Sequence, residues 1–375
     1  MEKFVLVFEI GSSAIRGMVA GRGINKTFKV KSYKEMLYDG FYEGNFLAQD
    51  KLYDTLNALM KELDITPSKN LDKVYFSLPS EFSSVRTVDV SLNLGERRKI
   101  KKSDVDSLSY TASEKAKNGD VEIVSITPIE YILDDGRKTL SPLGENASSI
   151  SAKMSIVYAN KEYIELFNSI ASRLMFERVE YLSEALCQSG YVIPKEKRDD
   201  LSLLIDVGDL TTSIAFPKGQ GLLGLTSFAR GGGFITNDLA EAFDLSIDEA
   251  NNLKQIIVLS LQGKKGDFYE LSSEGGIAKK ILLNTANEVV RYRIDELAKV
   301  ISRCVHMFAK DDISSLQVYL TGAGISKIKG GRDYLAKCLG RNVSFACPPL
   351  PGKDVPELAS ICSLLHFALL SEEKG

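Results

Sequence analysis

The chain of 375 residues is 44% hydrophobic and 26% charged, with a formal net charge of −3 at pH 7. This balance argues against nucleic acid or an anionic membrane as a global partner, and the length predicts roughly two to three domains. Five cysteines without a C-x-x-C pair indicate reduced, buried thiols in a cytosolic protein, and no apolar run approaches membrane-spanning length. We therefore expect a chain that neither spans a membrane nor is secreted.

The first segment predicts a meander of strands followed by a helix. An apolar run from Phe4 to Phe8 precedes a polar turn, and further strands are expected over 15–20 and 28–30. Apolar residues then recur at helical spacing and predict an amphipathic helix ending near Asp64: Leu52, Leu56, Leu59, Met60 and Leu63. Residues 67–72 mark a candidate domain boundary.

A different small α/β module is predicted over roughly 75–160. Residues 88–94 alternate apolar with polar side chains, as in a strand with one buried face, and further strands are expected over 121–126, 130–133 and 149–158. Ser103-Asp104 resembles a helix start with a capping side chain. The basic run 97–102 lacks interleaved aromatics, so we expect a solvated turn rather than a nucleic-acid site. A helix near Tyr163–Ile170 follows the module.

The second half begins near Leu201 with strands over 212–216 and 222–225. Gly231-Gly232-Gly233 leads into Thr236-Asn237-Asp238, and Ser246 with Glu249 forms a capping box that opens a helix through Lys254. Helical patterns continue from Ile277 to Phe308. A strand over 317–320 and a closing helix over 356–370 complete the chain.

Three glycine turns, each after an apolar run, organise the sequence. They are Phe8-Glu9-Ile10-Gly11-Ser12-Ser13, Ile205-Asp206-Val207-Gly208-Asp209-Leu210-Thr211-Thr212 and Leu320-Thr321-Gly322-Ala323-Gly324. The first two repeat the order acid, aliphatic, glycine, and their acids lie 197 residues apart, which leaves room for a whole domain. The spacing therefore predicts an internal duplication.

These turns have a chemistry in common with phosphate sites. Successive backbone N–H groups in a glycine turn can hold phosphate oxygens, and the hydroxyls of Ser12, Ser13, Thr211 and Thr212 add donors. Carboxylates at Glu9 and Asp206, if they face each other, can hold Mg²⁺ through water. The alternative for each turn alone is a simple hairpin corner.

With these residues the chain resembles the actin-like ATPase superfamily and, within it, the FtsA family of bacterial cell division. The three turns are similar to the family's two phosphate loops and its adenosine loop. Pro128-Ile129-Glu130-Tyr131 and Pro142-Leu143-Gly144 resemble segments of the FtsA insert, which sugar kinases and heat-shock ATPases lack. Gly232-Gly233 before Thr236-Asn237-Asp238-Leu239-Ala240, and Pro356 with Ala359, resemble the family's later helices.

The resemblance implies an α/β fold of duplicated actin-like (ribonuclease H-like) domains flanking an interdomain nucleotide cleft. Its expected parts are a first domain at 1–74 and 161–198, an FtsA-type insert at 75–160, a second core at 199–230 and 301–375, and an insertion subdomain at 231–300. It also implies ATP with Mg²⁺ at Glu9 and Asp206. The implied nucleotide contacts are Gly11, Ser12, Ser13, Gly208, Thr211, Thr212, Gly232, Gly233, Asn251, Lys254, Gly322, Ala323 and Gly324.

Several positions depart from the family's pattern. Asp209 and Leu210 stand where the second loop usually has glycines, which adds side chains and a carboxylate close to the phosphates. Ala14 replaces a common lysine, and Ser183 stands at the position that orients the attacking water, with Glu184 as a neighbouring candidate. We therefore expect weak or absent ATP binding and at most a slow ATPase.

The resemblance implies a cytoplasmic, filament-forming scaffold at the inner face of the membrane. Its expected partners are the tail of the tubulin-like division protein, other copies of itself, and further division proteins that bind the insert. Surface lysines in 231–300 would lie near the tail: Lys254, Lys264, Lys265, Lys279 and Lys280. The sequence stops at Gly375, before the membrane-binding helix common in the family, so either it is truncated or a partner provides membrane contact. The alternatives are an ATPase or kinase of the superfamily and a PilM-type pilus-assembly scaffold.

Overall fold

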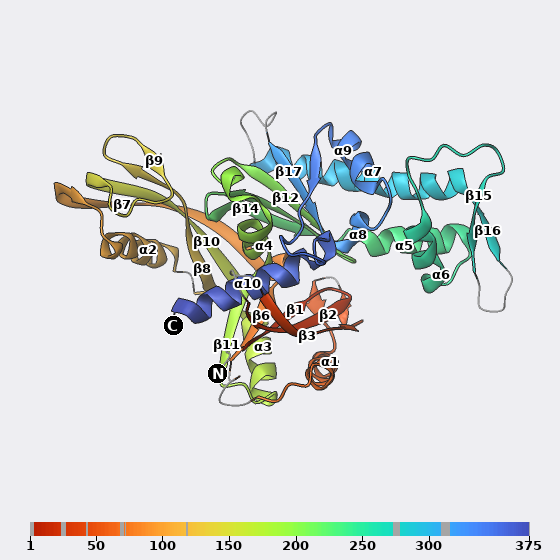
Figure 1. The fold of residues 1–375 in the computed structure, drawn as a ribbon, viewed down its shortest axis with the longest axis horizontal. Helices are drawn as coiled ribbons and strands as arrows, with labels where there is room; N and C mark the ends of the chain where they lie inside the picture. Colours follow the sequence, from red (N-terminus) through yellow and green to blue (C-terminus); the bar gives the residue numbers. More distant parts are fainter. Residues whose placement is uncertain are drawn as a thin grey trace. The chain divides into compact units, whose positions relative to one another are not determined.

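A computed structural model describes residues 4–23, 28–42, 44–67, 71, 73–117, 119–272, 278–308 and 316–374 (Figure 1). The chain divides into two compact units. Unit 1 comprises Met1–Ser202, Ala215–Thr226 and Ser360–Gly375, and unit 2 comprises Leu203–Ile214 and Ser227–Ala359. Each unit is described by itself.

The first five-stranded sheet forms the centre of unit 1. Its strand order is β11 (Arg178–Ser183), β6 (Lys73–Leu78), β1 (Phe4–Ile10), β2 (Ala14–Arg22) and β3 (Phe28–Leu37). Strand β1 pairs antiparallel with β2 and parallel with β6, and its nearly continuous apolar sequence is buried on both faces. Helix α1 (Gln49–Glu62) buries the predicted stripe of Leu52, Leu56, Leu59 and Met60.

The second five-stranded sheet repeats this order. It runs β14 (Gly221–Phe228), β13 (Thr212–Lys218), β12 (Ser202–Val207), β17 (Gln317–Thr321) and β18 (Val343–Phe345). In each sheet a meander of three consecutive strands is joined, beside its first strand, by two later strands. The predicted duplication is therefore confirmed. The boundary between the units falls within β12, β13, β14 and α10 (Ala359–Lys374).

The predicted insert is a four-stranded sheet with one helix. The order is β7 (Ser83–Lys99), β10 (Asn146–Asn160), β8 (Val121–Leu133) and β9 (Lys138–Thr139), and α2 (Lys102–Ala116) packs against the sheet (Figure 1). The core combines aliphatic and aromatic side chains, including Val90, Leu108, Tyr131 and Ile150.

Two details of the insert differ from the sequence-based expectation. Residues 121–126 and 130–133, predicted as two strands, form the single strand β8. The pairing with β10 shifts between Lys153 and Met154, so Ile129 is an extra residue that accommodates Pro128 in the strand. The basic residues 97–99 end β7 rather than forming a turn. Arg97 pairs with Asp134, and Arg98 pairs with Asp104.

Helices complete both units. They are α3 (Lys161–Arg173), α4 (Glu184–Val192), α5 (Gly232–Phe243), α6 (Ile247–Ile256), α7 (Leu283–Phe308), α8 (Ala323–Ser326), α9 (Gly331–Leu339) and α10. The shorter elements are β4 (Phe41–Tyr42), β5 (Asn45–Phe46), β15 (Phe268–Leu271), β16 (Lys279–Leu282) and the 3-10 turns η2 (Ser80–Phe82), η3 (Lys195–Lys197) and η4 (Pro356–Leu358). The predicted capping box is confirmed, because Glu249 N–H donates to Ser246 Oγ and Ser246 N–H donates to Glu249 Oε2.

The predicted helix over 277–308 begins too early. Residue 277 lies outside the described residues, and β16 precedes α7 because Ile281 pairs with Tyr269 of β15 and both are buried. The boundary candidate at 67–72 lies largely outside the described residues. The predicted domain boundaries stay predictions. The compact units place most of α10 with unit 1, whereas the sequence assigned it to the second core.

Candidate functional site

The first two glycine turns have the same backbone geometry. The N–H of Gly11 donates to the carbonyl of Ala14 at 3.0 Å, and the N–H of Gly208 donates to the carbonyl of Thr211 at 2.9 Å. Each bond closes the turn between the first and second strand of a meander. The repeated acid-aliphatic-glycine pattern thus encodes the same tight corner in both halves.

Glu9, the predicted metal carboxylate of unit 1, already pairs with a cation. It is 7% exposed and lies opposite Arg16 on the neighbouring strand, and the guanidinium Nη1 is 3.1 Å from Glu9 Oε1. Arg16 Nε also lies 2.5 Å from Glu35 Oε2 on β3. The Glu9 carboxylate raises the pKa of Arg16, so the guanidinium stays charged and competes with any metal ion for Glu9.

The second turn packs against the start of α5. The carbonyls of Gly208 and Asp209 accept the N–H groups of Gly232 and Gly233 at 2.9 and 2.8 Å. A side-chain carbon on Gly233 would lie 3.0 Å from Asp209 Oδ1, so the Asp209 carboxylate lies beside the glycine segment. These N–H groups are therefore bonded to backbone, and the added carboxylate lies close to them.

The third turn packs directly against the backbone of the second turn. Gly322 has φ +83°, and a side-chain carbon there would lie 2.3 Å from the Val207 carbonyl oxygen. The same atom on Gly324 would lie 2.5 Å from Gly208 O, and on Gly232 it would lie 2.4 Å from Gly324 Cα. Close backbone contact alone therefore requires glycine at these positions.

The predicted adenosine residues Asn251 and Lys254 both form a hydrogen bond with Thr236 of α5. Lys254 Nζ donates to Gly232 O at 3.1 Å and to Thr236 Oγ1 at 2.7 Å, and Thr236 Oγ1 donates to Asn251 Oδ1 at 2.9 Å. Burial lowers the pKa of Lys254, and the nearby Asp209 partly opposes this. Unit 2 thus brings together Gly208, Asp209, Gly232, Thr236, Asn251 and Lys254.

The remaining predicted site residues lie in the glycine turns or at the start of a helix. Thr212 Oγ1 donates to Arg230 O at 2.5 Å, and Thr211 lies in the turn closed by Gly208. Ser12 and Ser13 lie in the first turn, where Ser13 O accepts the N–H of Tyr38. Ser183 caps α4, since its Oγ accepts the N–H of Leu186 at 3.4 Å, and Glu184 begins that helix.

These donors fit a magnesium ion poorly. Arg16 provides a positive charge at Glu9, and among the described residues no group of three His, Cys, Asp or Glu side chains could hold a metal. Glu9 lies in unit 1 and Asp206 in unit 2, so their facing each other stays a prediction. In unit 2, several groups expected to hold nucleotide already have internal partners: the N–H groups of Gly208, Gly232, Gly233 and Gly322, the Thr212 hydroxyl and the Lys254 ammonium.

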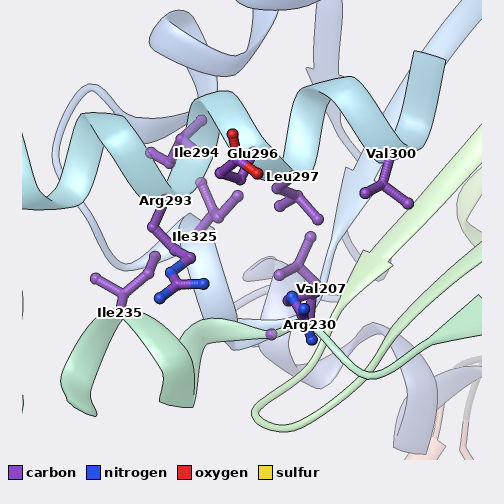
Figure 2. Close-up of a pocket in the computed structure, with 10 residues that line it drawn as sticks. Val207, Arg230, Ile235, Arg293, Ile294, Glu296, Leu297, Val300 and Ile325 are labelled. Atoms are coloured by element: carbon purple, nitrogen blue, oxygen red, sulfur yellow. The ribbon is translucent and has the colours of Figure 1, made fainter. Parts of the chain in front are cut away.

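A small cavity in unit 2 was not anticipated from the sequence. It has a volume of about 100 Å³ and an apolar lining from Val207, Ile235, Ile294, Leu297, Val300 and Ile325, with Arg230, Arg293 and Glu296 beside them. In Figure 2 the α7 residues lie along one side, and Val207, Arg230 and Ile235 lie along the other. The volume is below the ~150 Å³ of a cavity that holds benzene, so it fits one aliphatic side chain.

Two arginines define the polar side of this cavity. Arg293 forms a bidentate pair with Asp238 of α5, at 2.7 and 2.6 Å. Arg230 is exposed and, within the described part of the chain, has no carboxylate partner; its Nη1 donates to Ala229 O at 2.7 Å. The guanidinium groups of Arg230 and Arg293 lie 5.4 and 5.9 Å from the ring of Phe234. Sequence spacing alone gave no signal for this cluster.

The duplicated sheets and their glycine corners define an actin-like α/β protein. Solved structures agree: the chain is similar to one from a PilM-PilN type IV pilus biogenesis complex (17% identity, TM-score 0.65, 98% of this chain and 99% of that one). MreB5 of Spiroplasma citri bound to AMPPNP is also similar (11% identity, TM-score 0.59, 99% and 98%). Two family models match, Cell division protein FtsA over residues 203–363 and the SHS2 domain inserted in FTSA over residues 83–158. The chain belongs to the FtsA family, as a divergent member.

Individual relatives support this membership at low identity. FtsA of Staphylococcus epidermidis is 20% identical over 389 residues, covering 99% of this chain and 80% of that protein. FtsA of Buchnera aphidicola subsp. Schizaphis graminum is 19% identical, covering 97% and 90%. The resemblance to the FtsA family and the expected fold class are thus confirmed. The two family models favour FtsA over the PilM-type alternative. Within the described residues, none of the helices combines the length and hydropathy needed to cross a membrane.

Proposed function

We propose that this chain is an FtsA-like scaffold of bacterial cell division that assembles with itself and docks the acidic, hydrophobic tail of the tubulin-like division protein. In this role it works in the cytoplasm at the inner face of the membrane, and ATP is at most a structural ligand. The family supports the division role and self-assembly. Poor magnesium chemistry at Glu9 supports a scaffold rather than an ATPase or kinase.

The cavity beside Arg230 is the observation that carries the tail proposal. Its aliphatic lining fits one apolar side chain, and Arg230 offers an exposed guanidinium to a neighbouring carboxylate. The nearby Arg293 is neutralised by Asp238 and Glu296 by Lys299, so Arg230 gives this rim its net positive charge. A peptide that alternates acidic and aliphatic residues complements both features.

A synthetic peptide of the division-tubulin tail tests this function. We expect binding by titration calorimetry, weakened about tenfold or more by Arg230→Glu. Arg303→Glu is the matched control, because it makes the same charge change on α7 outside the cavity lining. Absence of peptide binding, or equal loss in both variants, contradicts the proposal. A PilM-type scaffold is expected to leave this peptide unbound.

A further inference from the structure

The insert segment Pro128-Ile129-Glu130 has no role in the proposed function, yet each residue has a partner at the end of β13 or in the turn between β13 and β14. The carbonyl of Pro128 accepts the N–H of Gln220 at 2.9 Å, and Glu130 Oε2 lies 3.6 Å from Lys218 Nζ. Gly219 lies against the Ile129 carbonyl. The extra residue in β8 thus occurs where the insert meets this turn.

The close approach requires glycine in the turn. Gly219 has φ +65°, and a side-chain carbon there would lie 2.1 Å from Ile129 O. The same atom on Gly221 would lie 2.5 Å from Ser155 Cβ. Any side chain at either position would force the two segments apart.

Ser155 of β10 provides the second half of this contact. The side chain is fully buried, and its Oγ accepts the N–H of Leu222 at 3.0 Å and donates to the carbonyl of Leu222 at 2.8 Å. Strand β14 is the edge of its sheet, so one hydroxyl here satisfies both backbone groups that a further strand would have paired. Losing the hydroxyl would leave a buried N–H and carbonyl unpaired, which is costly.

We propose that this seam, residues 128–130 and 155 against 218–222, fixes the orientation of the insert, and that self-assembly of the scaffold depends on it. All of these residues belong to unit 1. Neighbouring copies can bind the insert well only if it is held in one orientation, because each degree of freedom lost on assembly lowers affinity. The assembly part rests on the proposed scaffold function.

Hydrogen exchange at the Leu222 and Gln220 amides tests the seam directly, because their acceptors belong to the insert. In Ser155→Ala we expect the Leu222 amide to exchange about tenfold faster. Ser151→Ala is the matched control, since the Ser151 hydroxyl donates to Ile132 O within the insert sheet. Unchanged exchange at Leu222 in Ser155→Ala overturns the seam.

A milder pair of variants covers the case in which Ser155→Ala fails to fold. Lys218→Met removes the turn's partner of Glu130, whereas Lys138→Met removes the partner of the same carboxylate inside the insert. We expect faster exchange at Gln220 only in Lys218→Met. Equal effects of the two variants overturn the seam.

Sedimentation of the same proteins tests the consequence for assembly. We expect sedimentable assemblies to be lost in Ser155→Ala and Lys218→Met and retained in both controls. Faster exchange with unchanged sedimentation overturns the link to assembly. Tail-peptide binding in these samples is measured separately: its absence in the native protein counts against the proposed function and leaves the seam standing.

Discussion

The guanidinium of Arg16 lies 3.1 Å from the carboxylate of Glu9, in direct cross-strand register between β1 and β2. The acid predicted to face a magnesium ion therefore has a cation built into its own sheet. Glu35 on β3 extends this charged row at 2.5 Å from Arg16. The row carries one positive and two negative charges, a net charge of −1, and the single guanidinium of Arg16 pairs with both carboxylates.

Replacing Arg16 by methionine tests whether the arginine takes the place of a metal. Because Glu9 is 7% exposed, we expect Arg16→Met to lower the free energy of unfolding by about 3 kcal/mol. Added Mg²⁺ should then raise the melting temperature of the variant but leave the native protein unchanged. Glu35→Gln, at the exposed end of the row, is the control and should cost less. Magnesium-dependent stabilisation of the native protein would contradict this account.

The second glycine turn gives a prediction about nucleotide. The double variant Asp209→Gly, Leu210→Gly removes a carboxylate and two side chains beside Gly208, so we expect it to bind Mg-ATP about tenfold more tightly than the native protein. Calorimetric titration measures both affinities.

Three results of that titration have distinct meanings. Tight binding by the native protein contradicts an impaired second loop. Binding by neither protein shows that the internally bonded Asn251 and Lys254 no longer serve adenosine. Steady turnover at roughly one per second or faster favours the enzyme alternative.

The start of α2 predicts a local pH response. Two hydrogen bonds from Arg98, at 2.8 and 2.9 Å, and one from the Lys101 N–H lower the pKa of Asp104 from 3.8 to about 2. Because the folded pKa is lowered, this stabilisation is present above pH 4 and is lost as pH falls toward 2. Amide exchange in the first turn of α2, compared at pH 5 and pH 2.5, should show this loss in the native protein.

Two variants isolate the effect. Asp104→Asn should remove the difference between the two pH values, because its amide does not titrate. Asp106→Asn changes an exposed neighbour in the same turn and should preserve it. An equal response in both variants would show that general acid unfolding, rather than Asp104, opens the helix.

How far the sequence predicts the structure depends on how local each feature is. The Ser246 to Glu249 capping box and the two glycine corners follow from neighbouring residues, and the structure has all three. The Glu9 to Arg16 pair could also have been predicted from the sequence, because the tight turn between β1 and β2 places these two residues, seven apart, opposite each other.

Other features depend on packing between distant segments. Glycine at 232, 322 and 324 has the same sequence signature whether ligand or backbone approaches it, and here backbone does. The Arg293 to Asp238 pair joins α7 to α5 across 55 residues of chain. The cavity beside Arg230 depends on that packing, so no local pattern indicates it.

The last prediction concerns how α10 is held on unit 1. Lys73 of β6 lies 2.6 Å from Glu180 Oε1 on β11 and 2.8 Å from Glu372 Oε1 on α10. Tyr75 OH donates to the same Glu372 oxygen at 2.7 Å, and Ser371 Oγ donates to Glu180 at 3.0 Å. The Lys73 and Glu372 side chains are 14% and 11% exposed, so water screens this pair little. Glu180 is 38% exposed, so its pair with the same ammonium group is screened more.

Lys73→Met removes the cation between these two carboxylates and keeps a side chain of similar length. We expect it to lower the free energy of unfolding by about 3 kcal/mol, measured by urea denaturation, and to speed amide exchange in the last turns of α10. Lys34→Met is the matched control, because its pair with Glu62 is 48% and 60% exposed and should contribute less than about 1 kcal/mol. If both variants lose equal stability, the loss comes from the methionine itself rather than from the network. If α10 exchanges no faster in Lys73→Met, apolar packing alone holds this helix on the first sheet.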